Sequence, residues 1–143
     1  MVKRRSGKIL AISCDGATTP RAGFAVYSAS KAAVARFVES IAEEVRDSNV
    51  QVNSMLPGGA YTSMTDEVLH AGMRISDTEL EVATQVRLTG GMPAEKQLQL
   101  ALFLASERSN HVTGKLIRVQ DDWKKLETDG LRPDVFTLRR THR

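Results

Sequence analysis

The chain has 143 residues, 41% of them hydrophobic, which is enough to bury the core of one domain of ordinary size. Its net charge of +3 reflects 20 basic against 17 acidic residues, which are spread through the chain with small basic clusters at its two ends, Lys3-Arg4-Arg5 and Arg139-Arg140. Short basic ends of this kind are typical of solvated tails, and two tyrosines and four phenylalanines provide no aromatic platform. We therefore predict no nucleic-acid binding.

The single cysteine, Cys14, cannot form an internal disulfide, and the first residues are charged where a signal peptide needs an apolar core. No apolar run approaches the roughly 20 residues that cross a bilayer. These features predict a cytoplasmic protein with no membrane partner.

Apolar runs and helical periodicity alternate along the first third of the chain. Residues 8–14 form a continuous apolar run, as in strands that are buried on both faces. After a turn-forming stretch at 15–23, helical spacing predicts a helix that begins near Ser28 or Ser30 and ends near Asp47. Its predicted apolar positions are Val34, Phe37, Val38, Ile41 and Val45.

The remaining elements follow the same alternation. Residues 50–56 predict a second buried strand, ended by Pro57-Gly58-Gly59. A weaker pattern at 61–91 suggests small helices around 64–71 and 77–86. Pro93 then introduces a helix that ends near Ser106, with Leu98, Ala101, Leu102 and Leu104 available for burial, and a third strand is expected at 112–119.

Strands separated by helices favour an α/β layer structure, because a parallel strand pair needs a crossover connection. We predict one domain over residues 1–120 with about three parallel strands. Residues 121–143 form a polar, basic tail with turn signals at Asp129-Gly130 and Arg132-Pro133, and we expect this tail to lie on the surface.

Tyr27 and Lys31 are four residues apart, so they stack on one face of a helix. A cation about 4 Å from a phenol would favour phenolate by up to roughly 4 kcal/mol at an effective dielectric near 20. The tyrosine would then have a lowered pKa and could act as a general acid/base. Taken alone, the pair also fits an ordinary helix start whose lysine extends along the surface to water.

The surrounding sequence resembles the short-chain dehydrogenase/reductase family. The segment Tyr27-Ser28-Ala29-Ser30-Lys31 is similar to the family's Tyr-x-x-x-Lys motif, and residues 7–14 resemble its fifth strand. Residues 50–58 are similar to the sixth strand and its Pro-Gly turn, whereas 103–106 and 113–116 resemble the last helix and the seventh strand. The resemblance covers roughly residues 7–120 and implies the carboxyl-terminal part of a Rossmann-like, doubly wound parallel sheet.

The resemblance also implies roles for particular residues. Tyr27 would exchange a proton with the oxygen of an alcohol or carbonyl substrate while hydride moves to or from NAD or NADP. Lys31 would lower the pKa of Tyr27 and hold the nicotinamide ribose. The cofactor-binding loop implied by the resemblance comprises Pro57, Gly58, Ala60 and Thr62. By itself, Pro57-Gly58-Gly59 is equally compatible with a turn that only ends a strand.

Cys14 occupies the position of the family's catalytic serine. A thiol is a weaker hydrogen-bond donor than a hydroxyl, so substrate polarisation should suffer unless Ser13 supplies the missing contact. Cys14 could instead pack inertly or serve as a nucleophile, although no histidine lies near it in sequence. The histidines His70, His111 and His142 lack metal-ligand spacing, so we predict no metal site.

No glycine-rich strand-to-helix turn of the G-x-G-x-x-G type occurs in the chain, so a pyrophosphate-binding loop is absent from it. We therefore expect an NAD(P)-dependent oxidoreductase fragment that is inactive by itself and forms a homo-oligomer or pairs with a missing amino-terminal half. A non-catalytic interaction module, which would use its sheet edge or the 28–47 helix, and a truncated remnant without function are the alternatives. The substrate and the choice between NAD and NADP stay open.

Overall fold

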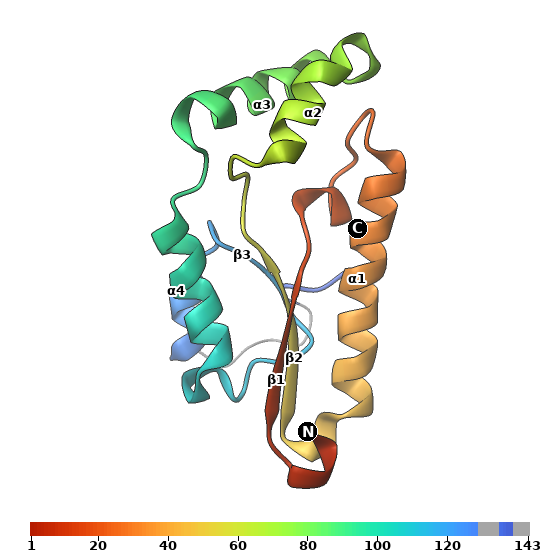
Figure 1. Cartoon of the computed structure of the whole chain (residues 1–143). Helices are drawn as coiled ribbons and strands as arrows, with labels where there is room; N and C mark the ends of the chain where they lie inside the picture. Colours follow the sequence, from red (N-terminus) through yellow and green to blue (C-terminus); the bar gives the residue numbers. More distant parts are fainter. Residues whose placement is uncertain (129–134, 139–143) are drawn as a thin grey trace.

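The computed structural model describes residues 1–128 and 135–138. Within these residues the structure has three strands and four helices, and three of the helices lie between β2 and β3 along the chain (Figure 1). Their bounds are β1 Gly7–Ile12, α1 Ala25–Glu44, β2 Val50–Leu56, α2 Ser63–Ala71, α3 Asp77–Thr89, α4 Ala94–Ala105 and β3 Leu116–Arg118. Short 3-10 turns connect several of them, including η2 Asp15–Ala17, η5 Glu107–Ser109 and η6 Trp123–Glu127.

The strands form one parallel sheet in the order β1-β2-β3, with Gly7 paired to Val50 and Ser54 paired to Leu116. Helices α1 and α4 cover opposite faces of the sheet, and α2 and α3 lie beyond its carboxyl end (Figure 1). The predicted α/β fold with three parallel strands is confirmed. The third strand is shorter than predicted because Gly114 adopts a left-handed conformation, with φ of 67°, just before it.

Strand β2 is central and buried along its whole length. Its polar residue Asn53 is only 2% exposed, and its amide satisfies two backbone groups of the neighbouring segment. Asn53 Nδ2 donates to the Val112 carbonyl at 2.8 Å, and Asn53 Oδ1 accepts from the Lys115 amide at 3.1 Å. This side chain therefore joins β2 to the approach of β3, where the backbone ladder is interrupted.

The hydrophobic core is divided by the sheet. On the α4 side, Phe103 and Leu100 pack against β2 and β3, while Val38 and Ala42 of α1 pack against the opposite face. The large, almost fully buried side chains are Phe103, Leu56, Leu100, Ile117, Val38, Val52 and Val112.

Several predicted core positions are exposed instead. Phe37 of α1 is 65% exposed, and Leu98 and Leu102 of α4 are more than half exposed. These helices extend past the sheet at β1, which pairs with a strand on one side only among the described residues, so their outer faces have no strand to cover. Helical periodicity identified apolar positions but not which of them meet the sheet.

The expected surface tail has two buried side chains among the residues that the structure describes, although most of residues 121–128 are exposed. Trp123 and Leu126 of η6 are buried in the α4-side core, and the Trp123 ring lies 5.3 Å from that of Phe103. Phe136 packs against the same core. The polar composition of residues 121–143 as a whole gave no indication that these apolar side chains pack in the core. The predicted turns at 129–130 and 132–133, the Arg139-Arg140 cluster and His142 lie outside the described residues.

Candidate active site

Tyr27 and Lys31 come from the amino-terminal end of α1. The helix begins at Ala25, earlier than predicted, so Ser28 and Ser30 lie inside it and do not cap it. Tyr27 is therefore in the first turn, and the Lys31 ammonium lies 5.6 Å from the centre of its ring. Lys31 Nζ donates to the Ile12 carbonyl at 3.3 Å, which places the ammonium at the end of β1.

Cys14 follows β1 and lies beside the phenol. Burial is the main cause that raises the pKa of Tyr27 above its ordinary value. The charge on the Cys14 side chain and a hydrogen bond with it raise the pKa further, whereas the nearby Arg21 guanidinium opposes the shift. The direction is opposite to the one predicted from the Tyr27-Lys31 spacing. Lys31 directs its ammonium to a backbone carbonyl at the strand end, so desolvation of the phenol prevails.

Ser13 has its hydroxyl turned to the backbone. The side chain is 2% exposed, and its Oγ donates to the Lys31 carbonyl at 3.0 Å. Because a hydroxyl has a single proton to donate, this bond occupies the donor that a substrate oxygen would need. Ser13 thus anchors β1 to α1, and Cys14 is the side chain at this position that contacts the phenol.

The loop after β2 forms the facing wall. Gly58 has φ of 77°, a conformation that strains any other residue, and a Cβ there would lie 3.3 Å from the Met92 and Gln120 side chains. Ala60 forms an isolated antiparallel bridge with Gly91, and Thr62 directly precedes α2. The Pro57-Gly58 turn is therefore also a close packing point between β2 and the start of α4.

A cavity of about 540 Å³ lies at the carboxyl ends of β1 and β2. All eight residues singled out from the sequence line it, namely Ser13, Cys14, Tyr27, Lys31, Pro57, Gly58, Ala60 and Thr62. Residues that the sequence did not single out complete the wall, and these include Arg21 and Phe24 ahead of α1 and Glu79 of α3. Arg21 and Glu79 are 58 positions apart, so no local sequence pattern could predict that they meet at this cavity.

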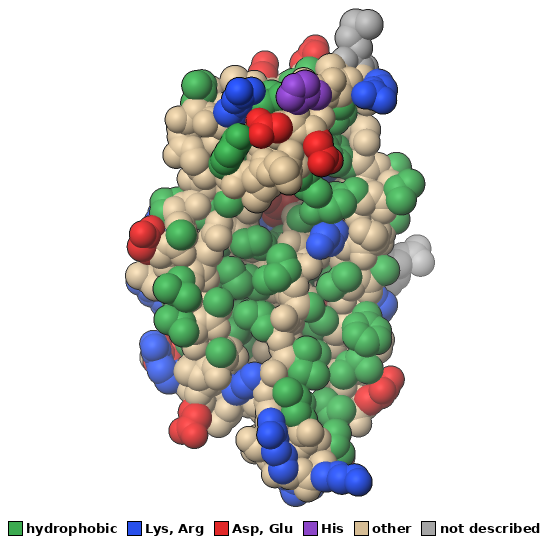
Figure 2. Space-filling view, in the orientation of Figure 1, with side chains coloured by type: hydrophobic (Ala, Val, Ile, Leu, Met, Phe, Trp, Pro, Cys, Tyr) green, Lys and Arg blue, Asp and Glu red, His purple; other side chains and the backbone are tan. Residues whose placement is uncertain are grey.

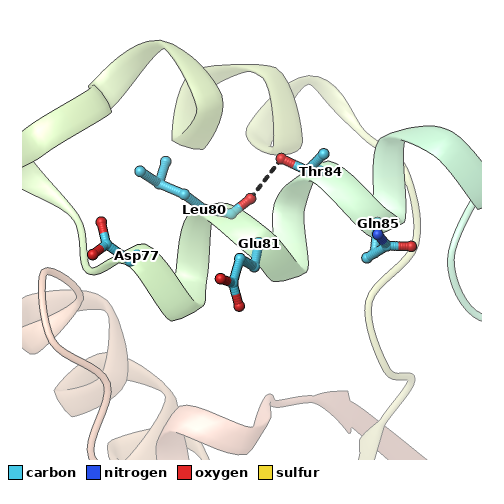
Figure 3. A pocket seen from close by; sticks show the side chains of 5 residues that line it. All are labelled: Asp77, Leu80, Glu81, Thr84 and Gln85. Atoms are coloured by element: carbon cyan, nitrogen blue, oxygen red, sulfur yellow. Dashed lines mark hydrogen bonds between the residues drawn. The ribbon is translucent and has the colours of Figure 1, made fainter.

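A second hollow, of about 400 Å³, runs along one side of α3 (Figure 3). Its walls are Asp77, Leu80, Glu81, Thr84 and Gln85, all from this one helix, and the Thr84 hydroxyl is already bonded to the Leu80 carbonyl. Because no second element contributes a polar group, this hollow offers no convergent site.

Among residues 1–128 and 135–138, no three His, Cys, Asp or Glu side chains gather as metal ligands would. His70 Nδ1 lies 2.6 Å from the Asp66 carbonyl, and His111 Nε2 faces the Leu126 carbonyl, so both rings make local backbone contacts. None of the described helices is long and apolar enough to span a membrane.

Comparison with known proteins identifies the class of fold. The structure resembles actinorhodin polyketide ketoreductase, determined with NADPH, with a TM-score of 0.69 at 23% identity; the match covers 83% of this chain and 48% of the other. A short-chain type dehydrogenase/reductase from Mycobacterium ulcerans gives a TM-score of 0.65 at 29% identity over 83% of this chain and 42% of that one. The fold is thus that of Rossmann-like short-chain dehydrogenases.

The sequence gives the family directly. The family model described as short chain dehydrogenase matches residues 1–72, half of the chain, and the chain belongs to this family. A 3-oxoacyl-[acyl-carrier-protein] reductase of Chlamydia pneumoniae is 34% identical over 119 residues, which are 83% of this chain and 46% of the relative. An uncharacterized oxidoreductase of Bacillus subtilis is 27% identical over 86% of this chain and 48% of its own length. The chain spans about half the length of these curated relatives.

Proposed function

We propose that this chain is the carboxyl-terminal catalytic part of a short-chain oxidoreductase that interconverts an alcohol and a carbonyl with NAD or NADP. The observation that carries the proposal is the convergence of Tyr27, Lys31 and Cys14 in one cavity at the carboxyl ends of two parallel strands. In open α/β sheets this is the edge where ligands bind. The domain would extend past the predicted boundary at residue 120, because Trp123 and Leu126 belong to its core.

Tyr27 would donate a proton to the substrate oxygen. Its raised pKa keeps the phenol protonated at neutral pH, so the site suits proton donation to a carbonyl oxygen better than proton removal from an alcohol. When bound, the nicotinamide supplies or accepts the hydride. We therefore propose that Tyr27 supplies the proton that carbonyl reduction needs near neutral pH, while the concentrations of substrate and cofactor set the net direction. The reductase named among the relatives agrees with this role.

The residues present fit the nicotinamide and ribose end of the cofactor. Lys31 Nζ bonds one backbone carbonyl at 3.3 Å and, as an ammonium with three protons, has donors to spare for ribose hydroxyls. The left-handed Gly58 brings bare backbone to the cavity wall beside Pro57, and Ala60 and Thr62 extend that wall. These residues would orient the ring relative to the Tyr27 phenol.

Cys14 sets the strength of substrate polarisation. Its thiol adjoins the phenol and takes the place of the serine hydroxyl of the family. The Ser13 hydroxyl cannot replace it, because Ser13 already donates its proton to the Lys31 carbonyl. Cys14→Ser should therefore strengthen the hydrogen bond to the substrate oxygen and raise kcat in an assembled enzyme. An unchanged kcat in that variant would show that the thiol does not contact the reacting oxygen.

The pyrophosphate and adenine end of the cofactor would require residues beyond those of this chain, so we propose that the purified 143-residue chain is inactive. The first experiment is a fluorescence titration of the chain with NADH and NADPH, with Tyr27→Phe and Lys31→Ala as matched variants. Saturable binding that Lys31→Ala abolishes and Tyr27→Phe retains would support the proposed cofactor contact.

The same titration, repeated after addition of an amino-terminal half taken from a relative, separates the two parts of the proposal. Binding that appears only with the added half would support a split site and inactivity of the chain alone. Turnover of a carbonyl substrate by the chain alone would refute the proposed inactivity. Binding that Lys31→Ala leaves unaltered would refute the assignment of Lys31.

A second candidate function is pairing with another chain through the β1 edge. Ile9 and Ile12 of β1 are 42% and 50% exposed, and Phe37 of α1 and Leu98 of α4 are exposed on the adjoining helices. Figure 2 shows apolar side chains gathered over β1 and the neighbouring faces of these helices. An apolar edge of this kind favours association with a further strand.

The pairing function would be tested by light scattering during size-exclusion chromatography, with Ile9→Lys as the edge variant and Leu88→Lys, on the exposed side of α3, as the control. An oligomer that Ile9→Lys dissociates and Leu88→Lys preserves would support it. A monomer at all concentrations would refute self-association through this surface. The surface would then be left for the complementary half of the oxidoreductase domain.

A further inference from the structure

Helices α2 and α3 form a helical hairpin, here called the lid, and side chains of both helices line the cavity. Its two ends meet at the Ala60-Gly91 bridge, where the Tyr61 amide donates to the Gly90 carbonyl at 3.1 Å and the Met92 amide donates to the Gly59 carbonyl at 2.7 Å. The lid is thus attached to the sheet at one narrow base.

Little apolar burial holds the lid beyond that base. Among its described side chains, α2 buries only Thr65 and α3 buries only Ala83. Val82 and Leu88 of α3 are exposed. A segment that buries so little apolar surface opens at low cost unless polar contacts restrain it.

One polar contact joins the lid to the loop ahead of α1, and both of its residues line the cavity. The Arg21 guanidinium, in the loop ahead of α1, makes a two-pronged ion pair with the Glu79 carboxylate of α3, with Nε 2.6 Å from Oε1 and Nη2 bonded to Oε2. The two side chains are 26% and 13% exposed, so the pair is largely shielded from water. Partial burial and bidentate geometry make such pairs stronger than surface ion pairs.

Arg21 is held in place for this contact. Its guanidinium lies 4.5 Å above the centre of the Phe24 ring. A Cβ added at Gly23 would lie 3.1 Å from the Arg74 carbonyl oxygen, so the loop packs closely against the hairpin. Figure 1 shows the loop ahead of α1 reaching toward the end of the α2-α3 hairpin. The Glu79 hydrogen bond is also the main cause that raises the pKa of Arg21.

We propose that the Arg21-Glu79 ion pair is a latch that holds the lid closed over the cavity and controls access to Tyr27 and Cys14. The inference goes beyond the proposed oxidoreductase function, because it concerns entry to the cavity and holds whatever reaction occurs there. Release of the latch would free α2 and α3 to swing about the Ala60-Gly91 base while the sheet, α1 and α4 stay in place.

Cys14 makes the latch measurable, since it is the only cysteine in the chain and lines the same cavity as the ion pair. The experiment follows alkylation of Cys14 by iodoacetamide, a neutral reagent, in the intact 143-residue chain and in Glu79→Gln. Loss of a charge-assisted pair of this kind should raise the alkylation rate about tenfold. The comparison uses the limiting rate at high pH, where every thiol is ionised, so a shifted thiol pKa does not contribute.

Arg87→Gln is the matched control, because Arg87 forms an ion pair with Asp66 within the lid, 3.9 Å apart, and does not reach the opposite wall. Its alkylation rate should equal that of the parent chain. The charge-reversed double variant Arg21→Glu with Glu79→Arg should restore slow alkylation. Hydrogen exchange should accelerate across residues 63–89 in Glu79→Gln and stay unchanged in β2.

Two results would overturn the latch. Alkylation and hydrogen exchange that are the same in Glu79→Gln as in the parent chain would show that the ion pair does not restrain the lid. An equal acceleration in Arg87→Gln would show that any loss of charge loosens the hairpin. If Glu79→Gln failed to fold, as judged by loss of exchange protection in β2, the pair would be a requirement for folding and the latch would likewise be rejected.

Discussion

The sheet with α1 and α4 and the α2-α3 lid are stabilised in different ways, although both line the same cavity. The sheet region buries Phe103, Leu100 and Ile117 almost completely, whereas the described side chains of the lid bury only Thr65 and Ala83. The first region is fixed by packing, and the second is held mainly by its base and by one ion pair. A site built from both can keep its reactive groups rigid while its entrance moves.

The largest expected effect lies in the core of the sheet region. Phe103→Ala should lower the free energy of unfolding by about 3–5 kcal/mol, because it removes a buried ring that packs on Trp123 and leaves a cavity. Leu88→Ala, at a 74% exposed position of the lid, should change it by less than about 0.5 kcal/mol. Urea unfolding measures both, and equal losses would contradict the difference between the two regions.

Next in size is the buried amide of β2. Asn53→Ala should cost about 2–4 kcal/mol, since it leaves the Val112 carbonyl and the Lys115 amide without their partner in a dry environment. Gln99→Ala removes the same kind of side chain from the exposed face of α4 and should be nearly neutral. If thermal unfolding showed no difference between the variants, another polar group would have to satisfy these backbone atoms.

The base of the lid should be destabilised by a single methyl group added at Gly91. Gly91 has φ of 77°, and a Cβ there would lie 2.1 Å from the Gly59 carbonyl oxygen, so Gly91→Ala should cost about 1–3 kcal/mol locally. Gly90 has a similar φ of 80° but open space around it, so Gly90→Ala carries the backbone strain alone. Faster hydrogen exchange of α2 and α3 in Gly91→Ala than in Gly90→Ala is the expected result, and the reverse order would exclude the clash as its cause.

The smallest effect is the titration of Tyr27. In Tyr61→Phe, Tyr27 is the only tyrosine, and ultraviolet titration should give a pKa above 10 because of burial and the neighbouring thiol. Cys14→Ser should lower this pKa, whereas Arg21→Ala should raise it further. A pKa below 10 in the Tyr61→Phe chain would restore the sequence-based expectation for Lys31.

The sign of the linked stability follows from the same shift. A folded state whose phenol has a raised pKa binds that proton more tightly than the unfolded chain does, so its contribution is complete below pH 10 and is lost as the pH rises through the folded pKa. Unfolding free energy should therefore fall with rising pH above 10. The fall should be smaller in Tyr27→Phe, which has no proton to lose.

Much of the fold and the composition of the cavity could be predicted from local sequence. Short apolar runs separated by helical segments predicted the three strands, and the Tyr27-Lys31 spacing placed both side chains on one helix face. Because parallel strands end at the same edge, residues that follow β1 and β2 had to meet there, which is why Cys14 and Pro57 share a cavity.

Sequence by itself therefore determined the elements, their order and the residues at the strand ends, since these depend on short-range geometry and on chain direction. Only the tertiary structure decided which apolar side chains are covered, that Trp123 is buried, that Ser13 turns to the backbone, and that Arg21 meets Glu79. Each of these depends on desolvation and on contacts between distant segments, and the same physics sets the direction of the Tyr27 pKa shift.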